Sequence, residues 1–151
     1  MNGRSSTARR ARGFSVVVLL VVGVLSAGCV KPDEPPQPPL GNWRITGYYN
    51  ADTGAMAALV PGSGIHLTLG ADGRLEGVAC NVYGGLWLLD GDRFTVSDLW
   101  SHARACGSPE GVDGQEHQYF EALRAVNRAE VREGTLLLYG DDRQLVRAVR
   151  A

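Results

Sequence analysis

The amino-acid sequence predicts a mainly β fold of the α+β class, a small antiparallel β-sheet or partial barrel with one packed α-helix. From Ile65 to Leu69 apolar and polar residues alternate, which is the two-residue period of a strand with one buried face. Turn signals made of glycine and aspartate separate the apolar runs, and the chain contains 20 glycines. A later segment, Tyr119 to Val126, repeats its apolar residues at helical spacing instead.

Residues 1–28 have the order of a bacterial lipoprotein signal peptide. Four arginines precede an apolar run from Phe14 to Leu25, and small residues then lead to Cys29 in an arrangement that resembles a lipobox. The apolar run of about 12 residues is too short for a membrane span, which takes roughly 18 to 20. We therefore expect cleavage before Cys29, lipid on its thiol and attachment to a membrane. The alternative is an ordinary secretory signal that a cysteine happens to follow.

Residues 29–39 form the lipidated cysteine and a proline-rich tether, with five prolines between Lys31 and Pro39. Such a segment extends as polyproline II at about 3.1 Å per residue, which gives roughly 30 Å of spacer. The alternative use of a polyproline segment is as a ligand for a partner protein. Val30 stands where aspartate tends to retain lipoproteins in the inner membrane. In a host with two membranes we therefore expect the outer membrane, facing the periplasm.

The domain itself, residues 40–151, is expected to consist of short strands in hairpins. An opening strand contains Leu40, Trp43 and Ile45, and a loop of small residues follows it from Asn50 to Gly64. The further expected strands are 65–69 and 74–80 around Asp72-Gly73, 83–89 and 93–97 around Asp90-Gly91-Asp92, and 135–139 and 144–149 around Gly140-Asp141-Asp142.

The helix is expected to begin at Asp113, whose carboxylate can cap the first turn, with Glu116 three residues later. Arg124 and Arg128 suit the negative C-terminal end of such a helix. Its aromatic stripe is expected to pack on the sheet as core.

Two cysteines, Cys80 and Cys106, remain if Cys29 carries lipid. An even pair in a compartment that permits disulfides favours a bridge, which the loop-closure model values at roughly 3.5 kcal/mol. Two buried thiols are the alternative. A metal site is disfavoured, because the three histidines show no ligand spacing with the cysteines, and no cofactor is expected.

The charge of the chain disfavours nucleic acid as a partner. The whole chain has a net charge of −1, but four of its 15 basic residues lie in the signal peptide. The remaining 11 basic residues face 16 acidic ones, a net charge of −5 on one compact domain.

The sequence contains no motif of a known catalytic mechanism. It has no Gly-x-Ser-x-Gly elbow, no Walker loop, no dinucleotide fingerprint and no His-Glu-x-x-His helix. His102 and Cys106 are neighbours in sequence, which is not the spatial arrangement of a base and its nucleophile, and a bridged Cys106 has no thiolate. We therefore expect no enzyme and no catalytic residues. A hydrolase or thiol enzyme with an unrecognised site is the alternative.

The segment from Gly77 to Gly85, Gly-Val-Ala-Cys-Asn-Val-Tyr-Gly-Gly, resembles the META domain (HslJ-like) family. The same order of features continues with Cys106 and with Glu116 on the expected helix, and the resemblance covers residues 40–151. The sequence departs from the family pattern at residues 101–104, before the second cysteine, where members often carry threonine and methionine.

The resemblance implies a secreted or lipid-anchored antiparallel β domain with one helix and paired cysteines. Members are linked to heat shock, antibiotic tolerance, motility and virulence, with no agreed reaction. We therefore expect a non-catalytic, stress-related protein of the cell envelope that binds a protein, peptide or lipid through an open sheet face or edge. Asn81, Tyr83 and Trp87 are the candidate recognition residues, with Tyr83 and Trp87 on the exposed face. Asn81 has a structural alternative, which is to shape the turn.

Overall fold

The computed structural model describes residues 38–102 and 104–151 of the chain. The signal peptide, Cys29 and the tether up to residue 37 lie outside these residues. Nine strands and one helix make up the described part: β1 (Gly41–Asn50), β2 (Ala55–Ala57), β3 (His66–Leu69), β4 (Arg74–Val78), β5 (Val82–Asp90), β6 (Arg93–Ser101), α1 (Val112–Arg124), β7 (Arg128–Arg132), β8 (Thr135–Gly140) and β9 (Arg143–Arg150). No helix among the described residues is both long and apolar enough to cross a membrane.

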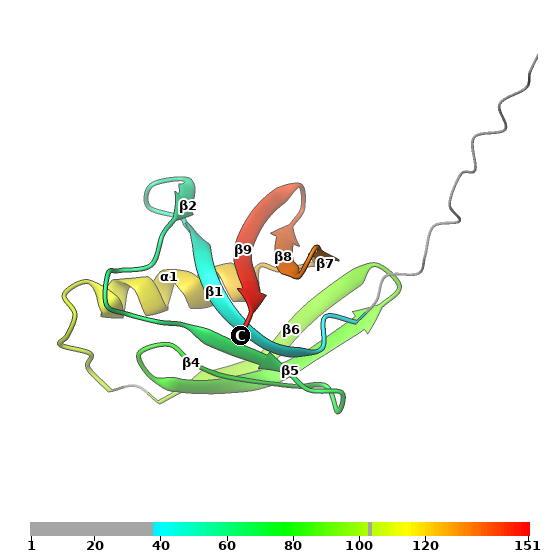
Figure 1. The fold of residues 1–151 in the computed structure, drawn as a ribbon, viewed down its shortest axis with the longest axis horizontal. Coiled ribbons are helices and arrows are strands. Elements are labelled where there is room, and N and C mark those ends of the chain that lie inside the picture. Colours follow the sequence, from blue (N-terminus) through cyan, green and yellow to red (C-terminus); the bar gives the residue numbers. More distant parts are fainter. Residues whose placement is uncertain (1–37, 103) are drawn as a thin grey trace, which may run out of the picture. The chain divides into compact units, whose positions relative to one another are not determined.

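All strand pairings are antiparallel, and the order in the sheet is β2-β1-β3-β4-β5-β6-β7-β8-β9. Strand β1 also pairs with β9, so the sheet curls into a ring (Figure 1). The ring is joined weakly at one place, because β6 and β7 share a single residue pair, Arg93 with Arg128. The predicted mainly β fold with one packed helix is therefore confirmed, as a ring that is not a clean barrel.

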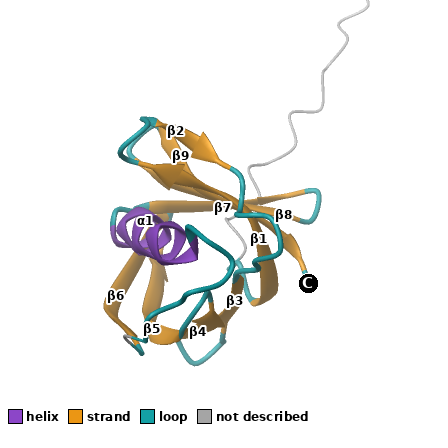
Figure 2. Ribbon diagram, turned by 90° about the vertical axis from the view of Figure 1, so that its left-hand side faces the viewer, coloured by secondary structure: helices purple, strands orange, loops and turns teal. Residues whose placement is uncertain are grey.

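Helix α1 lies within the curled sheet. Figure 2 looks nearly along the axis of the helix and shows the strands around it. Its stripe of Tyr119, Phe120 and Leu123 faces inward and joins the buried residues of the strands. On β3 the alternation predicted from the sequence places every second side chain in this core, and on β1 the same period holds from Trp43 to Ile45, before the register with β9 shifts. The fully buried Trp43 and Leu67 are examples.

Two strands were not predicted. Strand β2 lies within the expected loop of small residues, where Tyr48, Tyr49 and Asn50 pair with it. Strand β7 begins at Arg128, which was expected at the end of the helix. Arg128 instead lies with its guanidinium carbon 4.2 Å from the ring centroid of Tyr139, its partner in β8. The helix already ends at Arg124, which bonds to Glu121 at 2.7 Å.

The expected helix cap is wrong. The residue at the N-cap is Gly111 in the left-handed conformation, with φ of 87°, and no side chain caps the first turn. Asp113 is the second helical residue, and its Oδ1 accepts a hydrogen bond from the backbone N–H of Cys106 at 2.8 Å. Asp113 therefore holds the preceding loop, and its negative charge still lies at the positive end of the helix.

Candidate functional site

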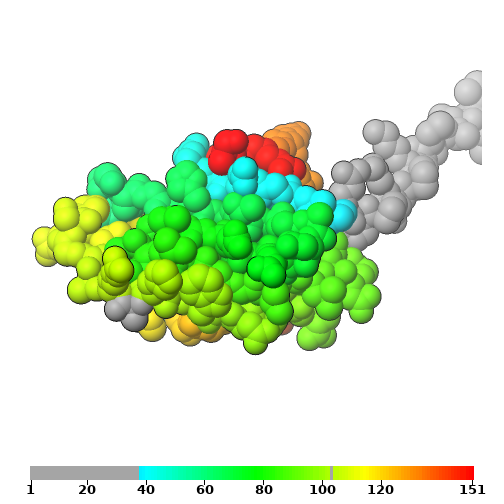
Figure 3. All heavy atoms as spheres, turned by 90° about the horizontal axis from the view of Figure 1, so that it is seen from below, coloured from blue at the N-terminus to red at the C-terminus, as the bar shows by residue number. Residues whose placement is uncertain are grey.

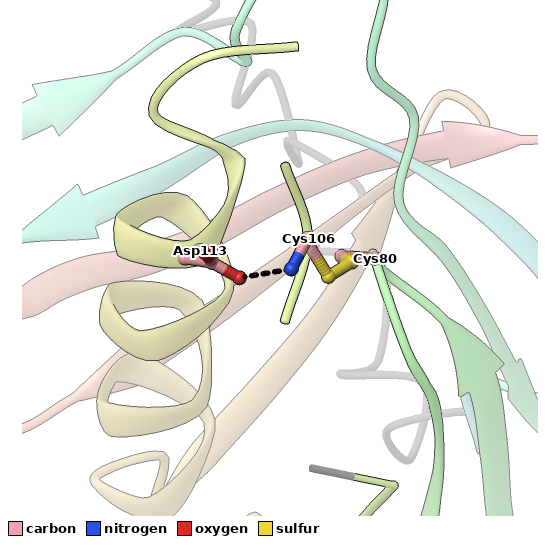
Figure 4. A group of neighbouring side chains, drawn as sticks. All are labelled: Cys80, Cys106 and Asp113. Atoms are coloured by element: carbon pink, nitrogen blue, oxygen red, sulfur yellow. Dashed lines mark hydrogen bonds between the residues drawn. A yellow bond between two sulfur atoms is a disulfide. The ribbon is translucent and has the colours of Figure 1, made fainter. Parts of the chain in front are cut away.

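The segment that resembles the family motif lies inside the domain, around a disulfide. Cys80, at the junction of β4 and β5, is bonded to Cys106, and their Cα atoms lie 6.2 Å apart. The predicted bridge is therefore present in the structure. It ties the β4–β5 junction to the loop between β6 and α1, and the Asp113 bond to Cys106 attaches the same loop to the helix (Figure 4).

Asn81 connects three segments through one buried side chain. Its backbone N–H and its Nδ2 donate to the two carboxylate oxygens of Glu116, at 2.7 and 2.8 Å. Its Nδ2 also donates to the carbonyl of Arg104 at 3.0 Å, and its Oδ1 accepts from the Arg104 N–H at 3.2 Å. Because Asn81 and Glu116 are both buried, these bonds replace the water that a carboxylate needs.

Tyr83 is fully buried and connects β5 to β3 and α1. Its hydroxyl donates to the carbonyl of His66 at 2.8 Å and lies 2.8 Å from the hydroxyl of Tyr119. The ring packs into space left by Gly77 on β4, where a Cβ atom would collide with it. Burial raises the pKa of Tyr83 and the pKa of Tyr119 well above the ordinary value of 10.0. Both hydroxyls are therefore neutral hydrogen-bonding groups of the core.

Trp87 points inward from β5 and is half-buried. Its ring stacks on Phe94, with centroids 5.6 Å apart, and its Nε1 donates to the carbonyls of Gly70 and Arg74, each at 3.1 Å. These bonds hold the turn between β3 and β4. One side of Trp87 lines a groove of about 570 Å³ with Pro38, Leu40 and Leu88.

The exposed face expected for Tyr83 and Trp87 is therefore wrong, because Tyr83 is buried and Trp87 belongs to the inward face of β5. Asn81, the third recognition candidate, is buried as well. The role of Asn81 is structural, but it is not the expected shaping of the turn, because its side chain bonds to Glu116 on α1 and to Arg104 in the loop before α1.

The group formed by Cys80, Cys106 and Asp113 has three potential metal ligands within 4.8 Å of one another. The two sulfur atoms are bonded to each other, so neither is a free thiolate, and a metal needs the thiolate form. Asp113 uses Oδ1 on the Cys106 N–H. This arrangement stabilises the loop and offers no binding site.

The surface feature that stands out is an apolar strip on the outer face of the sheet. Residues of β5 alternate, with Tyr83 and Trp87 inward and Leu86 and Leu88 outward. The cross-strand register adds outward neighbours from β4 and β6 to the same face. The outer strip consists of Val78, Val82, Leu86, Leu88 and Trp100, each 46% to 62% exposed. Figure 3 views a face of the molecule on which β3–β6, in green, form most of the surface.

Trp100 forms one wall of a groove of about 320 Å³ within this strip. It pairs with Gly84, and its indole covers that glycine so closely that a Cβ there would lie 2.7 Å from the ring. Leu86 lies on the next outward position of β5, and the charged residues at the groove are Arg74, Glu76 and Asp98. Asp98 sits at a bulge with φ of 50°. The groove thus combines an aromatic surface with donors and acceptors.

Sequence reasoning missed Leu86, Leu88 and Trp100. The available signal was that β5 is apolar on both faces, with Tyr83, Trp87 and Leu89 at odd positions and Val82, Leu86 and Leu88 at even ones. A domain with one core buries one face of such a strand, and the second apolar face indicates a surface with another use.

Comparison with known proteins agrees with this fold. A family model described as META domain matches residues 40–151. The chain is similar to an NMR structure of a protein from Burkholderia xenovorans, with 24% identity, a TM-score of 0.60, and coverage of 84% of this chain and 96% of that one. It is also similar to a crystal structure of a DUF4847 family protein from Bacteroides vulgatus, with 17% identity, a TM-score of 0.52, and coverage of 74% and 92%. No curated protein matches. The two structural likenesses bear on the fold alone, because both are below 25% identity.

Proposed function

The chain belongs to the META-domain family, and we propose that it is a lipid-anchored protein of the bacterial cell envelope that binds a partner without catalysis. The binding surface in this proposal is the outer strip, and a role in envelope stress belongs to the same proposal. The buried motif around Asn81 builds the fold, and the exposed residues of β4–β6 meet the partner.

The observation that carries the proposal is the exposure of five large apolar side chains on one face of three adjacent strands. Scattered apolar residues are normal on a protein surface, but a contiguous group marks an interaction site or an aggregation hazard. Trp100 adds to this, since tryptophan is enriched among the residues that dominate binding energy.

The alternative of a thiol enzyme or hydrolase finds little support among the described residues. Cys80 and Cys106 are bonded to each other, so neither is an available nucleophile. His66 lies on β3, His102 follows β6 and His117 is on α1, and all three are exposed. Base catalysis needs a histidine within hydrogen-bond reach of its nucleophile and held in place there.

The anchoring part of the proposal is tested by replacing Cys29 with serine. Cells that express the wild-type chain should incorporate labelled palmitate into it and retain it in the membrane fraction. Cys29→Ser should abolish the labelling and release the protein, because only the thiol accepts the lipid. Labelling that persists in Cys29→Ser, or that is absent from the wild type, would contradict the lipid anchor.

The binding part is tested by crosslinking in the native envelope from the outer strip. A photoreactive amino acid at Leu86 or Leu88 should capture a discrete partner, because both side chains point outward from β5. The matched control is the same amino acid at Val131, an exposed apolar position on β7. Identical products from Leu86, Leu88 and Val131, or no product from the strip, would refute the proposed surface.

A further inference from the structure

We propose that the groove beside Trp100 binds a neutral saccharide unit of an envelope glycan. This inference rests on the proposed function, because it names the class of partner that the outer strip receives. The groove is the part of the strip where polar side chains surround an aromatic surface.

The register of three strands builds the groove. Glu76, Gly84 and Trp100 form one row across β4, β5 and β6, and Arg74, Leu86 and Ser97 form the next row. Gly84 has no side chain, so the indole of Trp100 lies directly against the strand. One side of the ring thus covers backbone, the ring of His102 lies with its centroid 5.5 Å from that of Trp100, and half of the surface of Trp100 remains exposed to solvent.

This arrangement matches the two sides of a sugar ring. A pyranose has an apolar face of C–H groups, which packs on an aromatic ring, and a rim of hydroxyls that both donate and accept hydrogen bonds. Glu76 and Asp98 accept, and the guanidinium of Arg74 donates. The volume of about 320 Å³ lies at the small end of the range for ligand sites, which suits one or two sugar rings.

The charges at the groove favour a neutral sugar. The groove contains two carboxylates, Glu76 and Asp98, and one guanidinium, that of Arg74, so its charged side chains are negative in sum. The positive charge of Arg74 is also partly neutralised by Asp72, 3.3 Å away. A phosphorylated or otherwise strongly anionic chain would therefore meet like charge.

Two other ligand classes fit less well. An acyl chain would lie against charged side chains and remove them from water without replacing their hydrogen bonds. An extended peptide that binds by strand addition needs a free sheet edge, but β5 is paired with β4 on one side and with β6 on the other. The groove therefore lies on a face of the sheet, where side chains and not backbone groups meet the ligand.

The test uses the purified full-length chain in detergent, with cellotetraose and chitotetraose as neutral probes and ligand-observed saturation-transfer NMR as the readout. The wild type should transfer saturation to the ring C–H protons of at least one probe. Trp100→Ala should weaken that binding by about tenfold or more, as expected for the loss of an aromatic contact worth ~1.4 kcal/mol. Trp100→Phe should retain most of it.

The controls separate loss of the site from loss of the fold. Val131→Ala, on β7, should bind as the wild type does, and Asp98→Asn should weaken binding without lowering the melting temperature. Absence of binding by both probes, or equal binding by Trp100→Ala and wild type, would overturn the saccharide inference. If crosslinking from Leu86 still captures a protein in that case, the proposed function stands without the saccharide. If crosslinking also fails, both are wrong.

Discussion

At the scale of single residues, Asn81 shows how one side chain joins parts of the chain that are distant in sequence. Its amide contacts Arg104 and Glu116, which lie 23 and 35 residues further on. The family motif identified this asparagine from sequence, but its role was not predictable. A buried carboxylate partner on a helix is a property of the packed fold, and no local pattern near Asn81 indicates it.

Asn81→Ala is expected to lower the free energy of unfolding by about 2 to 4 kcal/mol, because it removes the Nδ2 donor from the buried carboxylate of Glu116. Urea denaturation measures the change. Combining Asn81→Ala with Glu116→Gln should cost less than the sum of the two single changes, since the double variant contains no buried charge. The matched control is Asn42→Ala, which removes an exposed bond from Thr68 and should stay within ~0.5 kcal/mol. A similar small effect for Asn81→Ala would contradict the role given to it.

At the scale of elements, the helix begins without the aspartate cap that the sequence predicted. Gly111 takes the N-cap place because the chain turns there with φ of 87°, a conformation that glycine adopts without strain. The sequence pattern identified the existence and the buried face of the helix, since these follow from its periodicity. The cap depended on how the preceding loop is tied to the disulfide, which periodicity does not encode.

Two glycines at this helix start should respond oppositely to alanine. Gly114→Ala should raise the free energy of unfolding by about 0.5 to 1 kcal/mol, because the position is helical and nothing lies within 4 Å of the added Cβ. Gly111→Ala should lower it by ~1 kcal/mol, because alanine is strained at this backbone angle even though Val60 leaves room. Thermal denaturation of both variants provides the comparison. Equal shifts of the same sign would argue against the left-handed N-cap.

The disulfide joins the β4–β5 junction to the loop before α1, and its removal should loosen that loop. Cys80→Ser with Cys106→Ser is expected to cost about 2 to 5 kcal/mol, because the unfolded chain loses a cross-link over 26 residues. Mass spectrometry of a non-reduced digest should show one linked peptide pair that contains both cysteines. Alkylation of both thiols in protein isolated without reductant would exclude the bridge.

Some strands could be predicted from the sequence, whereas β2 and β7 depend on packing in the fold. The hairpins at β3–β4, β5–β6 and β8–β9 were predicted, because each has apolar runs around a glycine–aspartate turn. Strand β7, Arg-Ala-Glu-Val-Arg, consists mostly of charged residues, which do not predict a strand. It forms a strand because each of its residues pairs with one of residues 135–139 of β8. Strand β2 is likewise a short edge strand that exists because β1 extends beyond its other partners.

At the scale of the whole molecule, a core with two neutral tyrosine hydroxyls makes stability sensitive to high pH. Tyr83 and Tyr119 each ionise near pH 10 in an unfolded chain, whereas burial raises the pKa of each in the fold. Their contribution is therefore fully present below pH 10 and is lost as the pH rises above that value.

The free energy of unfolding should fall above pH ~10 by up to about 1.4 kcal/mol per pH unit for each of these two tyrosines. Chemical denaturation at pH values from 8 to above 10 measures the slope, and tyrosinate absorbance should rise together with unfolding. The double variant Tyr83→Phe, Tyr119→Phe should show a much flatter dependence, although it begins from a lower stability. The same slope in the wild type and the double variant would assign the effect to other groups.

The pairing of β1 with β9 has a consequence for how the protein is made. Trp43 of β1 pairs with Arg150 of β9. About a hundred residues are therefore synthesised after β1 before its partner strand β9 exists. A nascent chain on the ribosome cannot close the ring before β9 has emerged, and contacts this distant in sequence form slowly. Until then the chain stays open enough to be threaded through a membrane channel, which is the route that a signal peptide at residues 1–28 would require.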